Sequence, residues 1–397
     1  MKNILYIVDN KFRDLWGLYN LKEKLKLKKI DLKICNKFNW NLAIKAFDPT
    51  IVITPNSRRD SKAFQKIIKI CKKKKIFSII YPSEGLEYNE EYLNYEFPPQ
   101  TLKDVDKFFL WAKDHGKIHK KKGFSKKVVV TGNLRFNDNL NYINKKKIKK
   151  IGITTTTRYT TSAISELNIP RLIFSRQHNP RLVSFIKQEL EFFDTISKIF
   201  KSFKNSNIKF ILKPHPFENV EIYKKAFPEV EIEYDTDIRN FLSKIDLLLN
   251  QESSTNIHAL KYKVPVINIE RLVKMNKGYQ SIYSAYLPSK LGLKIKSIKE
   301  LKKIVSQKNK ENIYKKNVKN GDLKLIEKIA PDLDTLNIMA KELGKIKIEK
   351  KSKLNFYYLL KYFIKDLLII IFNSRSTLFH PLLIKDYLLL KKFKIKK

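Results

Sequence analysis

The chain has 397 residues, of which 43% are hydrophobic and 12% aromatic, enough for two globular domains with substantial cores. Its formal net charge of +43 is typical of nucleic-acid-binding proteins. However, only 11 of the 82 basic residues are Arg, the residue that base and phosphate recognition favours. We therefore expect no specific nucleic-acid partner, and we assign much of the excess charge to solvated Lys. The remainder would favour anionic lipid or phosphorylated ligands.

The N-terminal half alternates short apolar runs with amphipathic stretches. The apolar runs predict strands at Ile4–Val8, Leu32–Cys35, Ile51–Thr54, Ile76–Tyr81, Phe108–Trp111 and Val128–Thr131. Helical patterns lie between them, for example at Leu15–Leu27 and Ser61–Lys74. Strands alternating with helices indicate βαβ units and a parallel sheet, so we expect one α/β domain over residues 1–136.

A polar, Lys-rich stretch at 137–150 predicts a linker, after which the alternation restarts. The second set of strands is expected at Ile151–Thr154, Ile208–Leu212, Val230–Ile232, Ile245–Leu249 and Val264–Ile269. Helices are expected at Leu182–Phe203 and Asn256–Lys263. The fold class is therefore α/β, with two Rossmann-like domains facing a cleft, the second over residues 151–330.

The C-terminal segment, 331–397, is predicted to be helical and to differ from both domains. Phe356–Phe372 is apolar and is interrupted by Lys361, Lys365 and Asp366, and five of the last seven residues are Lys. This pattern predicts an interfacial amphipathic helix with a polybasic end, at an anionic membrane surface. The alternative is a helix packed back on the protein, followed by a frayed basic tail.

Compartment is indicated by the cysteines and by the N-terminus. Cys35 and Cys71 cannot form a disulfide framework in a chain this long, which favours a reducing compartment. Residues 1–8 lead into a strand pattern without the features of a signal peptide. No segment reaches about 18 uninterrupted apolar residues. We expect a cytoplasmic protein that associates peripherally with the inner face of the cell membrane.

Two polar corners follow predicted strands of the second domain. Lys213-Pro214-His215-Pro216 is stiff because proline restricts φ, so it could hold an imidazole or ammonium against a phosphate oxygen. Ser253-Ser254-Thr255 opens a predicted helix and could bind phosphate through hydroxyl and backbone N–H groups. The alternatives are an ordinary turn and simple N-caps. Because ligands bind at the carboxyl ends of parallel strands, the pair predicts a nucleotide-phosphate site.

Three further strand ends carry candidate side chains. Thr154–Arg158 either extends its strand or forms a loop in which Arg158 reaches a phosphate or carboxylate. Glu84 is either a general base toward an acceptor hydroxyl or a solvated turn residue. Asp9 and Arg13 could contact an acceptor, while Asp14 is expected to cap the following helix. The histidines show no metal-ligand spacing and the ten glycines form no phosphate loop, so no metal is expected.

Several of these segments resemble a known group of proteins. Residues 8–14, Trp111 and residues 128–136 resemble the opening and interdomain segments of bacterial surface carbohydrate biosynthesis proteins. That family has Gly-Asn-Pro-Arg-Phe-Asp, where this chain has Leu134 in place of Pro and Asn137 before Asp138. The Lys-Pro-His-Pro and Ser-Ser-Thr corners resemble the capsule Kdo transferases and bacterial sialyl- and polysialyltransferases. The resemblance extends over about residues 1–275.

The resemblance implies a GT-B fold with an N-terminal acceptor domain, a C-terminal donor-nucleotide domain and a C-terminal helical tail. It implies a metal-independent glycosyltransferase, without a cofactor. This enzyme would move a Kdo- or sialic-like sugar from a CMP-sugar to a surface polysaccharide, lipopolysaccharide or lipid-linked acceptor. The implied catalytic residues are Glu84 and His215. The implied donor-binding residues are Ser253, Ser254 and Thr255. From their positions at strand ends, we add the donor-binding candidates Lys213, Arg158, Thr155 and Glu270, and the acceptor-binding candidates Asp9 and Arg13.

Competing functions remain open at this point. On the same fold, a glycerophosphotransferase or teichoic-type polymerase, or a sugar-nucleotide epimerase, could use a similar His-Pro corner. In a different class, the chain could be a non-catalytic scaffold of a surface-polysaccharide assembly, or a polyanion-binding protein supported by its charge alone.

Overall fold

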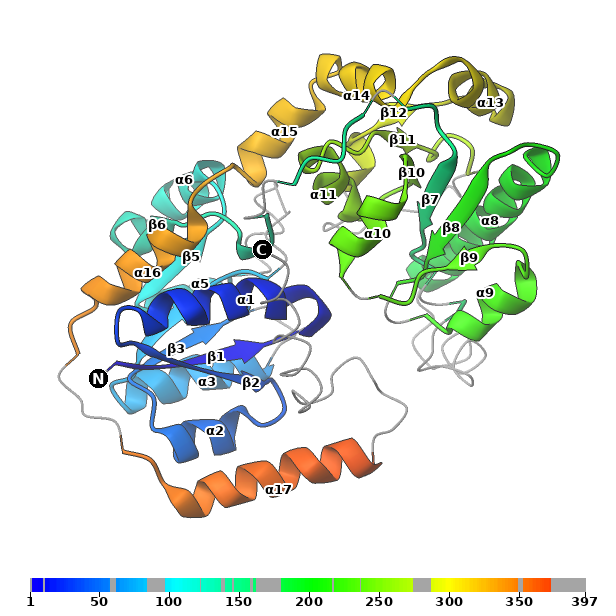
Figure 1. Cartoon of the computed structure of the whole chain (residues 1–397). Coiled ribbons are helices and arrows are strands. Elements are labelled where there is room, and N and C mark those ends of the chain that lie inside the picture. The colour runs from blue at the N-terminus through cyan, green and yellow to red at the C-terminus, as the bar shows by residue number, and fades with distance from the viewer. Residues whose placement is uncertain are drawn as a thin grey trace. The chain divides into compact units, whose positions relative to one another are not determined.

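The computed structural model describes most of the chain, which forms two compact units (Figure 1). The described residues are 2–9, 11–57, 62–83, 97–121, 123–136, 140–144, 146–157, 160–161, 180–215, 218–235, 237–273, 287–348 and 353–372. The first unit comprises 1–138 and the C-terminal segment from 327, and the second comprises 139–326. The C-terminal helices, which the sequence set apart from residue 331, therefore belong to the first unit.

The first unit contains a six-stranded parallel sheet in the order β2-β1-β3-β4-β5-β6. Its strands are β1 (Asn3–Val8), β2 (Asp31–Asn36), β3 (Ile51–Thr54), β4 (Phe77–Ile80), β5 (Lys107–Leu110) and β6 (Val128–Val130). All six predicted strands are confirmed within one or two residues. Continuous apolar runs form them because a parallel sheet buries both of its faces under helices.

Helices from both ends of the chain belong to this unit. They are α1 (Lys11–Lys26), α2 (Trp40–Phe47), α3 (Lys62–Lys73), α5 (Pro99–Asp104), α6 (Lys113–Lys121), α16 (Thr335–Lys345) and α17 (Phe356–Phe372). Short 3-10 segments are η1 (Ser125–Lys127) and η2 (Leu134–Phe136). Near the C-terminus, α16 packs against α1 and α17 packs against α2 (Figure 1). Among the described helices, none combines the length and the apolar composition that crossing a bilayer requires.

The second unit contains another six-stranded parallel sheet, in the order β12-β11-β10-β7-β8-β9. Its strands are β7 (Lys150–Thr154), β8 (Lys209–Lys213), β9 (Glu231–Ile232), β10 (Leu247–Asn250), β11 (Val266–Asn268) and β12 (Leu293–Lys294). Its helices are α8 (Pro180–Ser202), α9 (Val220–Ala226), α10 (Ile238–Lys244), α11 (Thr255–Lys261), α13 (Ile298–Gln307) and α14 (Lys310–Lys319), with η3 at Pro288–Lys290 and α15 (Asp322–Ile329) leading back to the first unit. Five of these six strands were predicted, and β12 was missed.

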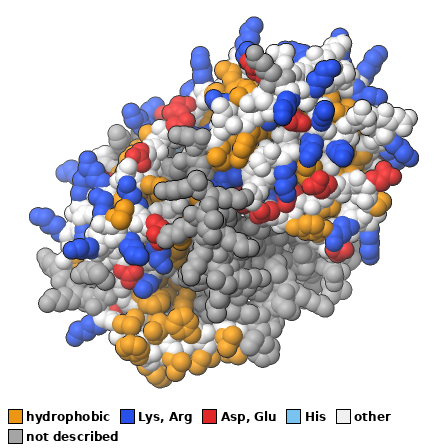
Figure 2. Space-filling view, in the orientation of Figure 1, with side chains coloured by type: hydrophobic (Ala, Val, Ile, Leu, Met, Phe, Trp, Pro, Cys, Tyr) orange, Lys and Arg blue, Asp and Glu red, His pale blue; other side chains and the backbone are white. Residues whose placement is uncertain are grey.

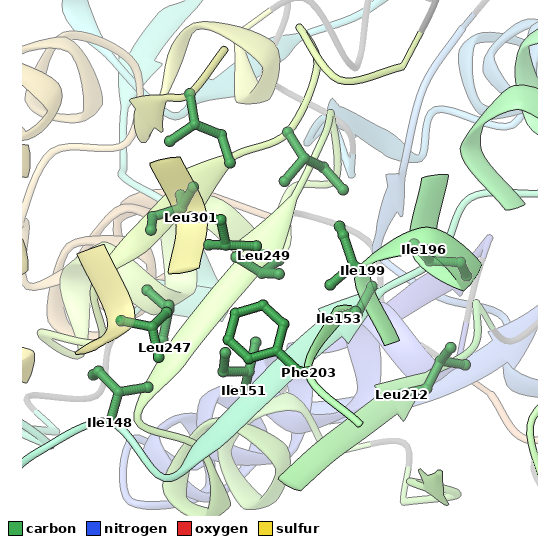
Figure 3. Packing of buried hydrophobic residues seen from close by; sticks show 14 of the residues in the cluster. Ile148, Ile151, Ile153, Ile196, Ile199, Phe203, Leu212, Leu247, Leu249 and Leu301 are labelled. Carbon is green, nitrogen blue, oxygen red and sulfur yellow. The ribbon is translucent and has the colours of Figure 1, made fainter. Parts of the chain in front are cut away.

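The core of the second unit lies between the sheet and its helices. Ile151 and Ile153 of β7 and Leu247 and Leu249 of β10 are fully buried (Figure 3). Phe203, just after α8, is labelled with these strand residues in the same cluster (Figure 3). The cluster therefore holds the two central strands in register, and with them the loops at their carboxyl ends.

The predicted linker at 137–150 packs on the second unit where it is described. The Tyr142 backbone N–H donates to the Tyr262 carbonyl at 2.9 Å, and the Ile148 side chain is buried in the second core. The N–H groups of Lys149 and Lys150 donate to Asp246 at 3.0 and 2.9 Å. The Lys side chains at 146, 147, 149 and 150 are exposed to solvent, while the buried Ile148 anchors the segment.

A glycine allows close packing between α1 and η2. A Cβ on Gly17 would lie 2.5 Å from the Leu134 Cβ and 2.7 Å from the Leu134 carbonyl oxygen. By contrast, a Cβ on Gly344 in α16 would meet nothing within 4 Å.

We expect Gly17→Ala to destabilise the protein by about 1–3 kcal/mol, because the new methyl group must displace backbone. Gly344→Ala is the matched control, and it should be neutral or stabilise by up to about 1 kcal/mol through helix propensity. Thermal or urea denaturation of the two variants measures the difference. Equal stabilities of the two variants would contradict the close packing.

Candidate functional site

The order of strands in the second unit determines where a ligand can bind. The chain runs from β7 to β8 and β9 on one side, then crosses to β10, β11 and β12 on the other. Loops that leave β7 and β10 therefore diverge at the reversal point, which is where open α/β sheets bind ligands. The predicted residues Thr155, His215 and Ser253 follow β7, β8 and β10, so the structure brings them to the same edge of the sheet.

The loops after β7 and β8 are tied together by one buried carboxylate. The His215 backbone N–H donates to Glu218 Oε2 at 3.0 Å and to Thr155 Oγ1 at 3.3 Å. Glu218 Oε2 also accepts from the Tyr223 hydroxyl at 2.8 Å and from the Thr155 hydroxyl. The Thr155 N–H donates to the Lys213 carbonyl at 3.2 Å, extending the strand pairing into the loop. This network holds the backbone on which the His215 side chain is carried.

Burial raises the pKa of Glu218 to about 7, although hydrogen bonds from Thr155, from Tyr223 and from the backbone of His215 act in the opposite direction. Only 4% of this residue is exposed. Sequence reasoning did not single out Glu218. The only indication was an acidic residue three positions after the histidine of the His-Pro pair.

The Lys213 side chain lies toward β9 and α10. Its Nζ donates to the Asp235 carbonyl and lies 5.8 Å from the centroid of the Phe241 ring. Burial lowers the pKa of Lys213, while the nearby acids Glu233 and Asp235 partly oppose this shift. The Lys213 ammonium group is therefore already hydrogen-bonded within the protein, to the Asp235 carbonyl.

Asn250 shapes the corner after β10. Its amide accepts from the Ser253 N–H and donates to the Ser253 carbonyl, both at 3.2 Å. Ser253 Oγ accepts from the Thr255 N–H at 3.3 Å and donates to Thr255 Oγ1 at 3.1 Å. Ser254 occupies the N-cap position of α11 without a side-chain capping hydrogen bond. The simple N-cap alternative is therefore not seen for Ser254.

A second asparagine connects this corner to β11. The buried Asn268 amide donates to the carbonyls of Gln251, Ser289 and Leu291, and its oxygen accepts from the Glu270 N–H at 2.8 Å. Glu270 itself forms an ion pair with Lys294 at 2.9 Å. Sequence reasoning missed both Asn250 and Asn268, although each is the last residue of an apolar strand run.

In the first unit, Asp9 and Arg13 belong to an ion network near the ends of β1 and β4. Arg13 donates to Asp9 at 3.2 Å, to Asp14 at 3.1 Å and to the Ser83 hydroxyl at 2.6 Å. Lys37 pairs with Asp9 at 2.8 Å. The predicted capping by Asp14 is wrong, because α1 begins at Lys11 and places Asp14 within the first turn.

Arg135 of η2 joins this network. Its guanidinium lies 3.6 Å from Asp14, donates to the Ser83 carbonyl and lies 5.7 Å from the Trp111 ring centroid. Close packing of η2 on Gly17 thus brings a second Arg to the end of β4.

Glu84 and Arg158 lie outside the described residues, so their roles remain predictions from the sequence. Within the described ranges, no group of three or more His, Cys, Asp or Glu could hold a metal ion.

Comparisons with known proteins reveal likeness of structure only. No protein-family model matches the chain, and no curated protein does. A protein from Listeria monocytogenes, assigned as a UDP-N-acetylglucosamine 2-epimerase, has a TM-score of 0.51 at 14% identity, over 88% of this chain and 99% of that one. A histidine-to-asparagine variant of the wall teichoic acid polymerase TagF, soaked with CDPG, has a TM-score of 0.52 at 11% identity, over 87% and 88%. A histidine-to-alanine TagF variant has a TM-score of 0.50 at 12% identity, over 87% and 89%.

The two parallel sheets and these structural neighbours establish the GT-B fold, with two Rossmann-like units. The predicted fold class is confirmed.

Ionisation of Glu218 should destabilise the native state. Its folded pKa of about 7 lies above the ordinary value of 4.5, so the native state retains the proton longer than the unfolded chain. Stability present below pH 4.5 is lost as the pH rises to about 7, on the order of 3 kcal/mol at about 1.4 kcal/mol per pKa unit. Glu218→Gln should therefore gain stability relative to the unmodified protein over this range. Denaturation midpoints measured at several pH values test this.

Glu221→Gln is the control for loss of one carboxylate, because the Glu221 side chain is 62% exposed. Parallel pH curves for Glu218→Gln and the unmodified protein would contradict a buried carboxyl with a raised pKa.

Proposed function

We propose that the chain is a nucleotide-sugar-dependent glycosyltransferase that builds a bacterial surface polysaccharide or lipopolysaccharide. The observation that carries the proposal is the convergence of the Thr155, His215 and Ser253 loops at the reversal point of the second sheet. This edge carries an imidazole and several hydroxyls, which are groups that phosphate oxygens can accept hydrogen bonds from. The GT-B fold and the surface-polymer enzyme among its structural neighbours support the same class.

In this proposal the donor phosphate lies against His215 and the hydroxyls of Ser253, Ser254 and Thr255. The acceptor oxygen forms a bond to the sugar carbon as the bond from that carbon to the nucleotide oxygen breaks. Glu84 takes the acceptor proton, and the nucleotide leaves with its electron pair. Donors held in place before the reaction stabilise this leaving charge, and each is worth about 3–4 kcal/mol in comparable sites.

The other donor-side residues act around this centre. Lys213 contributes its positive charge at a distance and not by direct contact, because its Nζ donates to the Asp235 carbonyl. Thr155 positions the His215 backbone. We assign Arg158 to the donor phosphate and Glu270, beside the β10 corner, to the ribose.

The first unit is proposed to bind the acceptor, a glycan or a lipid-linked glycan, near Asp9 and Arg13. The network of Arg13, Lys37 and Arg135 at the strand ends supplies cations for an acidic sugar. Cys35 and Cys71 are buried and form no disulfide, and burial raises the pKa of the Cys71 thiol to about 12, in keeping with a reducing, cytoplasmic location.

A second candidate function rests on the structural neighbours. One is assigned as an epimerase and another is a teichoic acid polymerase, and both share this fold. A sugar-nucleotide epimerase would act on a donor alone, and a glycerophosphotransferase would release CMP from CDP-glycerol. Either transferase consumes one acceptor for each nucleotide released, whereas the epimerase consumes none, so the donor that is used separates the two transferases.

His215→Ala should lower donor turnover by about 100-fold or more with the fold intact, because one preorganised donor to the leaving phosphate is lost. Lys209→Ala, at the opposite end of β8, is the control and should retain turnover. Nucleotide release with matched acceptor consumption is the measurement. Near-normal transfer by His215→Ala would overturn the assignment.

Donor identity is tested by thermal shift with CMP, CDP, UDP and GDP. Only a nucleotide that binds the folded state raises the midpoint, and a concentration of about 100 times Kd adds about 2.7 kcal/mol. We expect CMP to give the largest shift if the donor is a CMP-sugar of Kdo or sialic type. A preference for UDP indicates a UDP-sugar donor, which an epimerase or a transferase could use. A preference for CDP over CMP indicates a CDP-linked donor such as CDP-glycerol, and no shift with any nucleotide would contradict the site.

A further inference from the structure

One face of α17 is attached to the first unit over residues 355–365. Tyr362 is buried, and its ring meets Phe47 of α2 edge-on, with centroids 5.6 Å apart. At one end, the Asn355 N–H donates to the Ala46 carbonyl at 2.9 Å. Nearer the other end, Lys365 Nζ donates to the Phe38 carbonyl at 3.1 Å. These contacts hold the first part of the helix against α2.

The opposite face of α17 is apolar and exposed to solvent. Seven of its side chains are between 45% and 75% exposed, and they follow helical spacing. This outer face of α17 consists of Phe356, Tyr357, Leu360, Phe363, Ile364, Leu367 and Leu368. Figure 2 shows hydrophobic side chains gathered where α17 lies in Figure 1. A contiguous apolar surface of this kind marks an interaction site.

Lysines lie beside this apolar face and at its edge. Lys361 Nζ lies 4.2 Å from the Tyr357 ring centroid, and Lys45 Nζ lies 5.2 Å from the ring of Tyr358. The sequence of α17 contains two Lys and one Asp, and five of the last seven residues of the chain are Lys. Long Lys stems can lie along apolar surface while their charges reach the polar side of an interface.

Charge selects the occupant of this face. A second copy of a chain with net charge +43 would be repelled, whereas anionic phospholipid would be attracted. Aromatic and aliphatic side chains beside Lys also match the headgroup boundary of a bilayer. We propose that the outer face of α17 binds the surface of an anionic phospholipid bilayer, with the helix lying in the plane of the membrane. This proposal does not depend on the catalytic assignment.

The test is co-sedimentation with phosphatidylcholine vesicles, with and without about 30% phosphatidylglycerol. The unmodified protein should bind the anionic vesicles and bind neutral ones at least about tenfold more weakly. Leu360→Glu/Leu367→Glu should weaken anionic binding about tenfold or more, because two apolar side chains that the bilayer would bury are replaced by charges that it repels.

Leu27→Glu/Leu190→Glu is the matched control, because it replaces two exposed leucines elsewhere and changes the charge equally. This control should bind like the unmodified protein. Phe363→Trp gives a second measurement that does not depend on a disruptive variant: brominated lipid should quench the added Trp fluorescence.

Three results would overturn the proposal. The first is unchanged binding by the α17 variant, which would assign any attraction to the basic tail. The second is equal loss in the control, which would indicate charge alone. The third is a dimer, seen by analytical ultracentrifugation, that the α17 variant dissociates without any vesicle binding, which would make this face a contact between copies.

Discussion

The reversal of strand order between β7 and β10 is the constraint on which the candidate site depends. Parallel strands all place their carboxyl ends at one edge, so residues more than 90 positions apart in sequence arrive at neighbouring loops. Buried apolar side chains of β7 and β10 hold this register. Polar residues could not gather there without that packing, because buried polar groups require partners that only a defined backbone can provide.

Hydrogen bonds from within the protein then give the edge its shape. Glu218, Asn250 and Asn268 each satisfy several loop groups, and each is almost completely buried. They hold backbone and hydroxyl groups in place without being the groups that a phosphate would contact. Preorganisation of this kind is what transition-state stabilisation requires, since dipoles already oriented need not reorganise during the reaction.

In the C-terminal region, the structure confirms that α17 packs back on the protein, and the interfacial alternative stays a proposal for its exposed face. The sequence allowed α17 to be either interfacial or packed back on the protein. In the structure the helix has the predicted bounds, and Tyr362 packs inward while residues such as Phe363 face solvent. One helix can pack inward and also expose apolar side chains, because apolar residues lie on all of its sides and α2 covers only one side.

The amino-acid sequence by itself determined the fold class, because the two periods of hydrophobicity are local properties of the chain. Eleven strands and the long helices could be predicted from runs such as Ile51–Thr54 and Ile245–Leu249. The residues that follow those strands could be proposed as site residues for the same reason. Tertiary structure alone decided which partners they have: that Lys213 bonds to Asp235, that Arg13 bonds to Ser83, and that Glu218 ties the His215 loop to Thr155. These contacts join residues through the folded chain, and no local pattern encodes a hydrogen bond whose two ends are brought together only by packing.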